Sequence, residues 1–442
     1  MSEYKGGPVV TWRNWIQVFS VCAATIGLAA CSNAPDSRQD GRDRADAVQR
    51  VAKPAQAASI REAGNDLAFR LLASAAADDS RNAVVSPLSL GMTLDMLANG
   101  AEVAAGTQRR LLTARGFDTS MDIDTVNDAN RELIDSLTTP SPGVSLELAN
   151  AIWTSPGIEP DEKVARVVRS FYHGELTALD DDPEIGTREV NAWAARNTRG
   201  RITQIAQPDD LYPGGVAIPM LLANAMAFTG RWSDPFAPDE TRADVFRAEA
   251  AMHKVQMMSD EKPAAYLAVP GDTGFVAARL PYGRDRRWGL YVMVPNRDTG
   301  LADVLASLSG ASWRRWHDQF AREPQVLIEL PRMKLRMSRD LMRDLDALGV
   351  PREDYRGLIR DAASPYAIAA AKQDTYLKID EQGTKAAAVT TIGVVATAVP
   401  TQNVEQREVI ADHPYVLLLV DDVTGSIAMA CAIRQPNEES PA

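Results

Sequence analysis

The sequence predicts an α+β fold in one domain that extends from about residue 59 to residue 437 of the 442-residue chain. Helical and strand-like patterns interleave without the regular strand-helix-strand period that a parallel sheet requires. No polar linker interrupts the chain after residue 58, so nothing marks a second domain boundary. Near the C-terminus, YVLLLVDD and SIAMACAI flank VTG, which predicts a hairpin of two antiparallel strands.

The expected elements follow from hydrophobic spacing. Ordered structure is expected to begin near Ile60, with a first helix whose apolar residues recur at helical spacing: Ile60, Leu67, Leu71 and Leu72. Further helices are predicted at 87–99, 104–114, 124–138, 161–171, 187–197, 301–308 and 338–348, the last ending before Gly349. Strands are predicted at VSLELANAIW, PMLLANAMAF, FVAARL, WGLYVMVP, QVLIELP and TYLKID, in addition to the hairpin.

The N-terminal thirty residues predict a signal peptide, residues 1–30. Lys5 and Arg13 precede WIQVFSVCAATIGLAAC, whose apolar run ends in small residues before Cys31 and is shorter than the roughly 20 residues of a membrane span. LAAC at 28–31 resembles the bacterial lipobox, in which the cysteine is lipid-modified and becomes the first mature residue. A plain secretory signal or an uncleaved anchor remains an alternative.

Residues 31–58 then form the lipidated cysteine and a disordered tether, because this stretch is rich in Asp and Arg and has no aromatic residue. Residues 438–442 form a short C-terminal tail. After cleavage Cys431 would be the only unmodified thiol, so no disulfide is expected within the mature chain. The expected location is outside the cytoplasm, as a membrane-anchored lipoprotein in the periplasm or on the cell surface, or as an extracellular protein.

Charge and motifs exclude several classes of function. The formal net charge of -12 disfavours nucleic acid as a partner, and leaves the lipid on Cys31 as the expected membrane contact. The four histidines form no metal-ligand pattern, and GxSxG, GxGxxG, Walker and CxxC motifs are absent, so neither a metal nor a cofactor is expected. An enzyme is therefore not predicted, and a hydrolase with an unrecognised serine is the least favoured alternative.

Several motifs together resemble one family. NAVVSPLSLGMTLDMLANGA at 82–101 is similar to the second-helix signature of the serpins, the serine protease inhibitors. VNAWAARNTRGRI at 190–202 and LLANAMAFTGRWSDPF at 221–236 continue the resemblance, and the later motifs follow in the family's order: VQMM, MVPN, ELPRMKL, EQGTKAAA and DHPYVLLLVDDVTGSIAMACAI. The resemblance implies three β-sheets with eight or nine helices, and an exposed reactive centre loop that a protease cleaves.

The loop itself reads DEQGTKAAAVTTIGVVATAV at 380–399 and has no charge after Lys385. If it enters a sheet as a strand, alternate residues face the core. The inward set is small or apolar: Thr384, Ala386, Ala388, Thr390, Ile392, Val394 and Ala396. Lys385 then points outward, and Gly383 supplies a hinge because glycine reaches torsions closed to other residues. The hinge residues are Glu381, Gly383, Thr384, Ala386, Ala387 and Ala388.

The resemblance assigns further roles. Counted as in the family, the scissile bond is Thr397-Ala398, with Ala396 as a neighbouring possibility. Four residues match a polar cluster beneath the opening sheet: Ser86, Ser89, Asn224 and Gln373. Gln373 replaces the family's usual histidine and cannot titrate. Arg332 and Glu381 are expected to form an ion pair beside Trp232 at the point of first insertion; for Trp232 and the serines, core packing and helix capping are equally good readings.

The predicted function is suicide inhibition of a serine protease that accepts small residues, of the elastase or subtilisin type, by a monomer that forms loop-sheet polymers when heated. The alternative is a noninhibitory carrier or structural protein whose loop is cleaved without trapping the protease. Small residues at 384 and 386–388 favour inhibition, because noninhibitory members typically carry bulky, charged or proline residues there.

Overall fold

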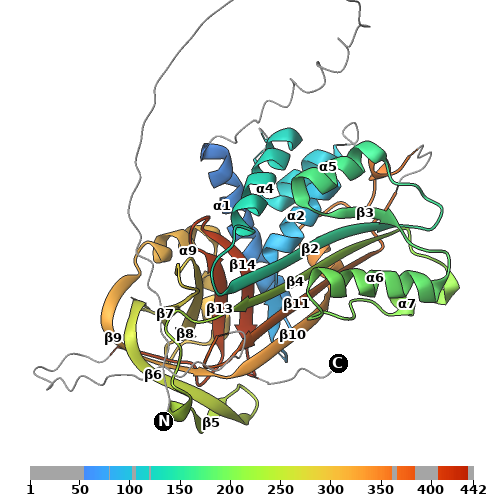
Figure 1. Cartoon of the computed structure of the whole chain (residues 1–442). Coiled ribbons are helices and arrows are strands. Elements are labelled where there is room, and N and C mark those ends of the chain that lie inside the picture. Colours follow the sequence, from blue (N-terminus) through green and yellow to red (C-terminus); the bar gives the residue numbers. More distant parts are fainter. Residues whose placement is uncertain are drawn as a thin grey trace, which may run out of the picture. The chain divides into compact units, whose positions relative to one another are not determined.

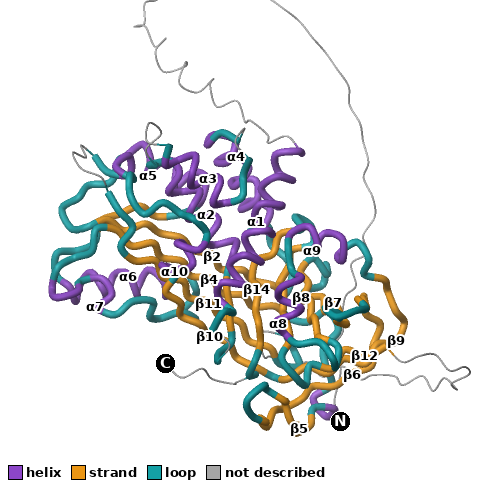
Figure 2. The backbone as a smooth tube through the Cα atoms, turned by 180° about the vertical axis from the view of Figure 1, so that it is seen from behind, coloured by secondary structure: helices purple, strands orange, loops and turns teal. Residues whose placement is uncertain are grey.

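The structure, a computed structural model, describes residues 54–78, 80–101, 106–118, 121–360, 366–383 and 407–436. Their strands form two sheets, and helices cover both (Figures 1 and 2). Ten α-helices lie within these ranges: α1 (Pro54–Ala75), α2 (Pro87–Ala98), α3 (Thr107–Arg115), α4 (Ile123–Leu137), α5 (Glu162–Tyr172), α6 (Pro183–Asn197), α7 (Pro208–Leu211), α8 (Leu301–Ser307), α9 (Gly310–His317) and α10 (Met342–Ala347).

The larger sheet has nine strands in the order β1-β14-β13-β8-β7-β6-β9-β12, with β5 paired to β6. Its strands are β1 (Ala83–Val85), β5 (Arg242–Arg247), β6 (Met252–Val269), β7 (Phe275–Tyr282), β8 (Trp288–Pro295), β9 (Ala321–Pro331), β12 (Arg407–Ile410), β13 (Tyr415–Asp421) and β14 (Ser426–Ile433). The predicted C-terminal hairpin is the antiparallel pair β13 and β14. Helix α9 lies beside β7 and β8 (Figure 2). Its Trp316 packs against Phe275 of β7, and its Trp313 packs against Tyr291 of β8.

The smaller sheet has five strands in the order β10-β11-β4-β2-β3. They are β2 (Val144–Thr154), β3 (Glu175–Ala178), β4 (Met220–Gly230), β10 (Met333–Asp340) and β11 (Ala370–Ile379). Helix α6 lies along one face of this sheet (Figure 1), where Trp193 and Val190 join an apolar cluster with Ala225 of β4. Helix α2 lies on the other face, between the two sheets.

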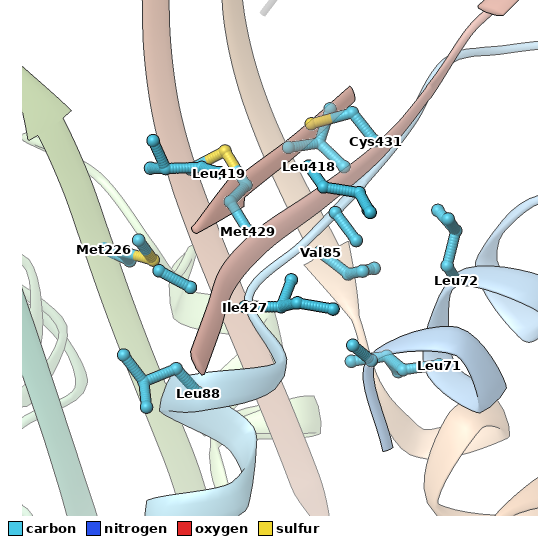
Figure 3. Close-up of a cluster of buried hydrophobic side chains, with 14 of the residues drawn as sticks. Leu71, Leu72, Val85, Leu88, Met226, Leu418, Leu419, Ile427, Met429 and Cys431 are labelled. Atoms are coloured by element: carbon cyan, nitrogen blue, oxygen red, sulfur yellow. The ribbon is translucent and has the colours of Figure 1, made fainter. Parts of the chain in front are cut away.

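The main hydrophobic core fills the space between the sheets and α1 and α2. Figure 3 shows Met226 of β4, Leu88 of α2 and Ile427 of β14 converging there, and all three are buried. The helix-spaced residues of α1 are fully or almost fully buried, as the sequence predicts: Ile60, Leu67, Leu71 and Leu72. Cys431 lies in the same core, and burial raises the pKa of its thiol well above the usual value.

Three expectations require correction. The described strands form two sheets and not three, because the 18-residue β6 pairs with β7 through one part and with β5 and β9 through the other, which joins two sheets into one. The predicted helix at 338–348 begins only at Met342, because β10 continues through Asp340 opposite Lys372. Ten α-helices replace the expected eight or nine within the described ranges, one of them the four-residue α7.

Helix α1 begins at Pro54, inside the stretch predicted as a tether and before the predicted domain boundary at 59. Proline suits the first turn of a helix, and the following PAQAAS is rich in helix-forming alanine. All described residues belong to one compact unit, 51–442. None of the described helices is long and apolar enough to span a membrane.

Candidate functional site

The candidate site is the seam between β4, the central strand of the five-stranded sheet, and its neighbour β11. These strands are parallel and pair from Ala370↔Leu221 to Leu377↔Phe228. Each has an antiparallel partner on its other side, β2 for β4 and β10 for β11. A strand placed between β4 and β11 and antiparallel to both would therefore make every neighbouring pair from β10 to β2 antiparallel, the geometry with the slightly more stable ladder.

A tight turn after β11 leads the chain back toward this seam. The backbones of Asp380 and Gly383 exchange two hydrogen bonds, of 2.8 and 3.0 Å, and Gly383 also forms a bridge with Arg231 at the end of β4. Gly383 has φ of +115°, and a Cβ there would lie 2.2 Å from the carbonyl oxygen of Gly230. Only glycine fits this position, in agreement with its predicted place at the hinge.

Side chains hold the turn from two directions. Trp232 is buried, stacks on Tyr282 with ring centroids 4.1 Å apart, and donates from Nε1 to the carbonyl oxygen of Asp380 at 2.8 Å. The backbone N–H groups of Trp232 and Phe236 donate to the carbonyl oxygens of Gln382 and Glu381 at 3.0 and 2.9 Å. Trp232 therefore both packs in the core and positions the turn.

The predicted ion pair between Arg332 and Glu381 is present, and Thr241 also donates to Glu381 at 2.5 Å. Burial raises the pKa of the Glu381 carboxyl, but the hydrogen bonds from Arg332 and Thr241 outweigh that effect, so the pKa lies below its usual value. Only 8% of the Glu381 side chain is exposed, whereas 35% of the Arg332 side chain is, so the carboxylate is the more buried partner of the pair.

A row of amide side chains crosses the seam on the face toward α2. Gln373, Asn224 and Asn150 are successive partners across β11, β4 and β2. Gln373 accepts from the Ser86 N–H at 2.9 Å and donates to the Ser86 carbonyl at 3.0 Å. Asn224 donates to Thr93 of α2, and the Asn150 amide lies within 3.1 Å of Asn224.

The serines connect this row to the start of α2. Ser86 is the N-cap residue and accepts from the Ser89 N–H, while Ser89 contacts the Asn150 amide through its hydroxyl. All four predicted members of the polar cluster thus lie together: Ser86, Ser89, Asn224 and Gln373. Ser86 also caps α2.

Two residues of this cluster, Asn150 and Thr93, were not predicted from the sequence. The segments around Asn150 and Asn224 share the letters LANA, which was the available signal.

The remaining predicted site residues lie outside the described ranges: Cys31, Thr384, Ala386, Ala387, Ala388, Ala396, Thr397 and Ala398. Within the described ranges, no group of three or more His, Cys, Asp or Glu side chains is arranged to hold a metal ion.

Comparison with known proteins identifies the family. The family model described as Serpin (serine protease inhibitor) matches residues 62–436, most of the chain. The chain belongs to the serpin family. An uncharacterized serpin-like protein of Thermococcus kodakarensis is 28% identical over 398 residues, which cover 88% of each chain. Serpin B8 of Bos taurus is 26% identical over 395 residues, 85% of this chain and 99% of its own.

Solved serpin structures share the fold. Human thyroxine-binding globulin complexed with thyroxine superposes with a TM-score of 0.77 at 23% identity, and covers 87% of this chain and 100% of its own. The thermophilic serpin tengpin in its native state gives a TM-score of 0.75 at 22% identity, over 85% and 94% of the two chains. The serpin family is in general one of protease inhibitors.

Proposed function

We propose that this serpin is a suicide inhibitor of serine proteases that accept small residues, and that residues 384–397 enter the seam as a strand after cleavage. The observation that carries the proposal is the position of Gly383. It already pairs with Asp380 after β11 and with Arg231 after β4, so the chain that follows starts between the two strands it would separate.

The two bridges define one register for the entering strand. Each step beyond Gly383 moves one residue back along β11 and one back along β4. Ala386 then lies between Leu377 and Phe228, which are already partners, and Thr390 lies between Gln373 and Asn224, which are partners too. Pairing with β11 and pairing with β4 therefore require the same register of the entering strand.

This register also assigns the faces of the entering strand. Leu377 and Phe228 are buried in the main core, so Ala386 and the residues alternating with it face that core. This is the inward set that the sequence predicts, beginning at Thr384 and including Thr390. Lys385 takes the opposite face, beside the partly exposed Lys378, where its ammonium can remain in water.

The chemistry belongs to the protease. Its catalytic serine oxygen attacks the carbonyl carbon of Thr397, the Thr397-Ala398 bond breaks, and Ala398 leaves as a new amino terminus while Thr397 stays esterified to the serine. Insertion of about 14 residues would carry the attached protease roughly 46 Å along the sheet at about 3.3 Å per residue. Trapping requires that this movement outruns hydrolysis of the ester.

Incubation with an elastase-like and a subtilisin-like protease, followed by denaturing electrophoresis, tests the proposal. A covalent complex that resists denaturation supports inhibition. Clean cleavage of the loop without a rise in thermal stability contradicts it and favours the noninhibitory alternative. A structural neighbour, thyroxine-binding globulin, was solved with thyroxine bound, so the assay must distinguish an inhibitor from a carrier.

The scissile bond has its own test. Ala396, Thr397 and Ala398 are small and neutral, which suits shallow protease pockets, whereas trypsin-like enzymes need Arg or Lys. Thr397→Arg should shift complex formation toward trypsin, with Ala396→Arg as the matched neighbour. An unchanged protease profile for Thr397→Arg together with a shift for Ala396→Arg would move the scissile bond by one residue.

Export and lipidation are part of the same proposal. The N-terminal sequence supports a bacterial lipoprotein with Cys31 acylated and residues 31–53 as the tether, which would place the inhibitor at a membrane in the periplasm, at the cell surface or outside the cell. Mass spectrometry of the N-terminal peptide should find diacylglycerol on Cys31, and Cys31→Ser should abolish it. Insertion of the loop of one molecule into the seam of another should also produce polymers on mild heating.

A further inference from the structure

One carboxylate at the seam has no role in the insertion scheme above. Asp374 lies on β11, opposite Ala225 of β4 and Ser338 of β10. It is fully buried, and neither of its carboxylate oxygens accepts a hydrogen bond of normal geometry from the described residues. A buried carboxylate without such partners is costly in its ionised form.

Asp374 faces α6, on the opposite side of the sheet from the amide row. Its partner Ala225 belongs to the apolar cluster beneath α6, to which the helix contributes Val190, Trp193 and Ala194. Tyr376, on the same face of β11, packs against that cluster. The environment on the β4 and α6 sides is therefore apolar.

The charged groups that act on Asp374 come from β10 and β11. The Ser338 hydroxyl, directly opposite on β10, lowers the pKa of the Asp374 carboxyl, and Arg336 of β10 and Lys372 of β11 lower it further by attracting the carboxylate. Lys372 is already paired with Asp210 at 2.8 Å, and Arg336 donates to the carbonyl oxygen of Gln204. Burial outweighs all three influences and raises the pKa of Asp374 from 3.8 to about 6.

Separation of β4 from β11 would remove this burial from one side. Water admitted to the seam would hydrate the carboxylate and return its pKa toward the ordinary value. The closed seam therefore binds the proton more tightly than the opened one, so raising the pH from 4 to 7 favours opening. The amide row on the other face contributes no such dependence, because Gln373 and its amide partners do not titrate.

We propose that Asp374 is a pH-sensitive catch in the seam: protonated, it lets β4 and β11 stay closed, and ionised, it favours their separation. The inference rests on the proposed opening of the five-stranded sheet for insertion. It places the pH response in a residue on the α6 side of the sheet, next in sequence to the position where the family's histidine is replaced by Gln373.

Amide hydrogen exchange of the full chain, read by mass spectrometry from pH 5.0 to 7.5, tests the catch without any protease. After correction for intrinsic exchange chemistry, the protection of β4 and β11 should fall about tenfold over this range, with a midpoint near pH 6. Strands β7 and β8 of the nine-stranded sheet serve as the internal reference and should change by less.

Asp374→Asn keeps the shape of the side chain and removes the charge. It should therefore abolish the pH-dependent difference in amide protection between the pair β4 and β11 and the pair β7 and β8. Asp318→Asn is the matched control, because the Asp318 side chain is 78% exposed and lies on no strand. A wild-type profile with no step near pH 6, or a step that survives in Asp374→Asn, would overturn the inference; a profile changed equally by both variants would do so as well.

The result is independent of the inhibition assay. A covalent protease complex with no pH step in the seam would leave the proposed function standing and reject the catch. A pH step that Asp374→Asn removes, without any protease complex, would keep the catch and reject inhibition.

Discussion

The nine-stranded and the five-stranded sheet share one hydrophobic core but bury different side chains at their centres. Strands β8 and β13 are buried along their whole length and almost entirely apolar. Strands β4 and β11 bury five polar residues instead: Asn224, Thr229, Gln373, Asp374 and Thr375. Apolar packing resists any separation of strands, whereas hydrogen-bonded side chains can exchange partners.

The difference separates a sheet whose central strands are packed by apolar side chains from the sheet that must open in the proposed inhibition. Strands β8 and β13 of the nine-stranded sheet have the continuous apolar packing expected of a permanent structure. The five-stranded sheet has a parallel seam, a row of amides and a buried carboxylate at the point where the proposed strand would enter. Matched substitutions in the two sheets test this division, in order of decreasing effect on stability.

The largest loss of stability is expected for a substitution in the nine-stranded sheet. Leu418→Ala empties a fully buried position of β13, shown in Figure 3, and should lower the free energy of unfolding by about 3 kcal/mol, because it leaves a cavity among apolar neighbours. Urea unfolding measures it. Val423→Ala, at a site 69% exposed just beyond β13, is the control and should change stability by less than about 0.5 kcal/mol. Equal losses for the two variants would contradict the assignment of rigidity to this sheet.

The next effect concerns the turn at the seam. Gly383→Ala forces a Cβ against the backbone of Gly230 at a positive φ, and should cost about 2 kcal/mol in unfolding free energy. Gly349→Ala provides the contrast, because Gly349 also has a positive φ but no atom within 4 Å of a Cβ, so only torsional strain of about 1 kcal/mol is added. If chemical denaturation finds Gly349→Ala to be the costlier change, the close approach at Gly383 is not important.

A smaller effect is expected in the amide row. Gln373→Leu leaves the backbone N–H and C=O of Ser86 without their partner and should cost about 1–2 kcal/mol. Thr375→Val is matched to it on the same strand and face, and removes a hydroxyl that has no hydrogen-bond partner among the described residues. Thermal unfolding should therefore show little change or a small gain for Thr375→Val, and a loss there as large as for Gln373→Leu would argue against a specific role for the row.

The smallest effect depends on pH. The Glu381 pKa is lowered in the folded protein, so the carboxylate adds stability above its ordinary value of 4.5, and that contribution is lost as the pH falls through the lower, folded value. Glu381→Gln should therefore reduce stability by about 1 kcal/mol at pH 7 and by less at pH 3. Glu240→Gln, at a nearby exposed position, should show no such dependence in unfolding curves at the two pH values. A loss for Glu381→Gln that persists at pH 3 would exclude the ion pair as its source.

Much of the fold could be predicted because most elements carry a periodic pattern. The strands with long apolar runs and the helix α1 appear where hydrophobic spacing predicts them. Strand β6 was missed because its sequence is polar and contains Pro263, which falls where the pairing with β9 shifts register. A proline at such an irregularity needs no ladder hydrogen bond, so the strand continues through a residue that usually ends one.

The candidate site was predictable only where it uses family motifs. Gly383, Trp232 and the pair of Arg332 with Glu381 lie together because each stands in a motif that the sequence shows. Asp374 was not predicted as a site residue, since alternation along β11 places it on the face that looks solvated in sequence. Only the position of α6, which comes from a distant segment, buries that face.

If the segment after Gly383 enters the seam as proposed, the bridge between Arg231 and Gly383 makes the seam sensitive to whether an insertion has an odd or an even number of residues. An insertion of one residue between Gly383 and the following segment would move every later side chain to the opposite face, with Lys385 directed into the core and the small residues toward α6. An insertion of two residues would restore the faces and only displace the segment by one repeat. Natural insertions or deletions after Gly383 should therefore be tolerated when they change the chain length by an even number of residues, and selected against when the number is odd.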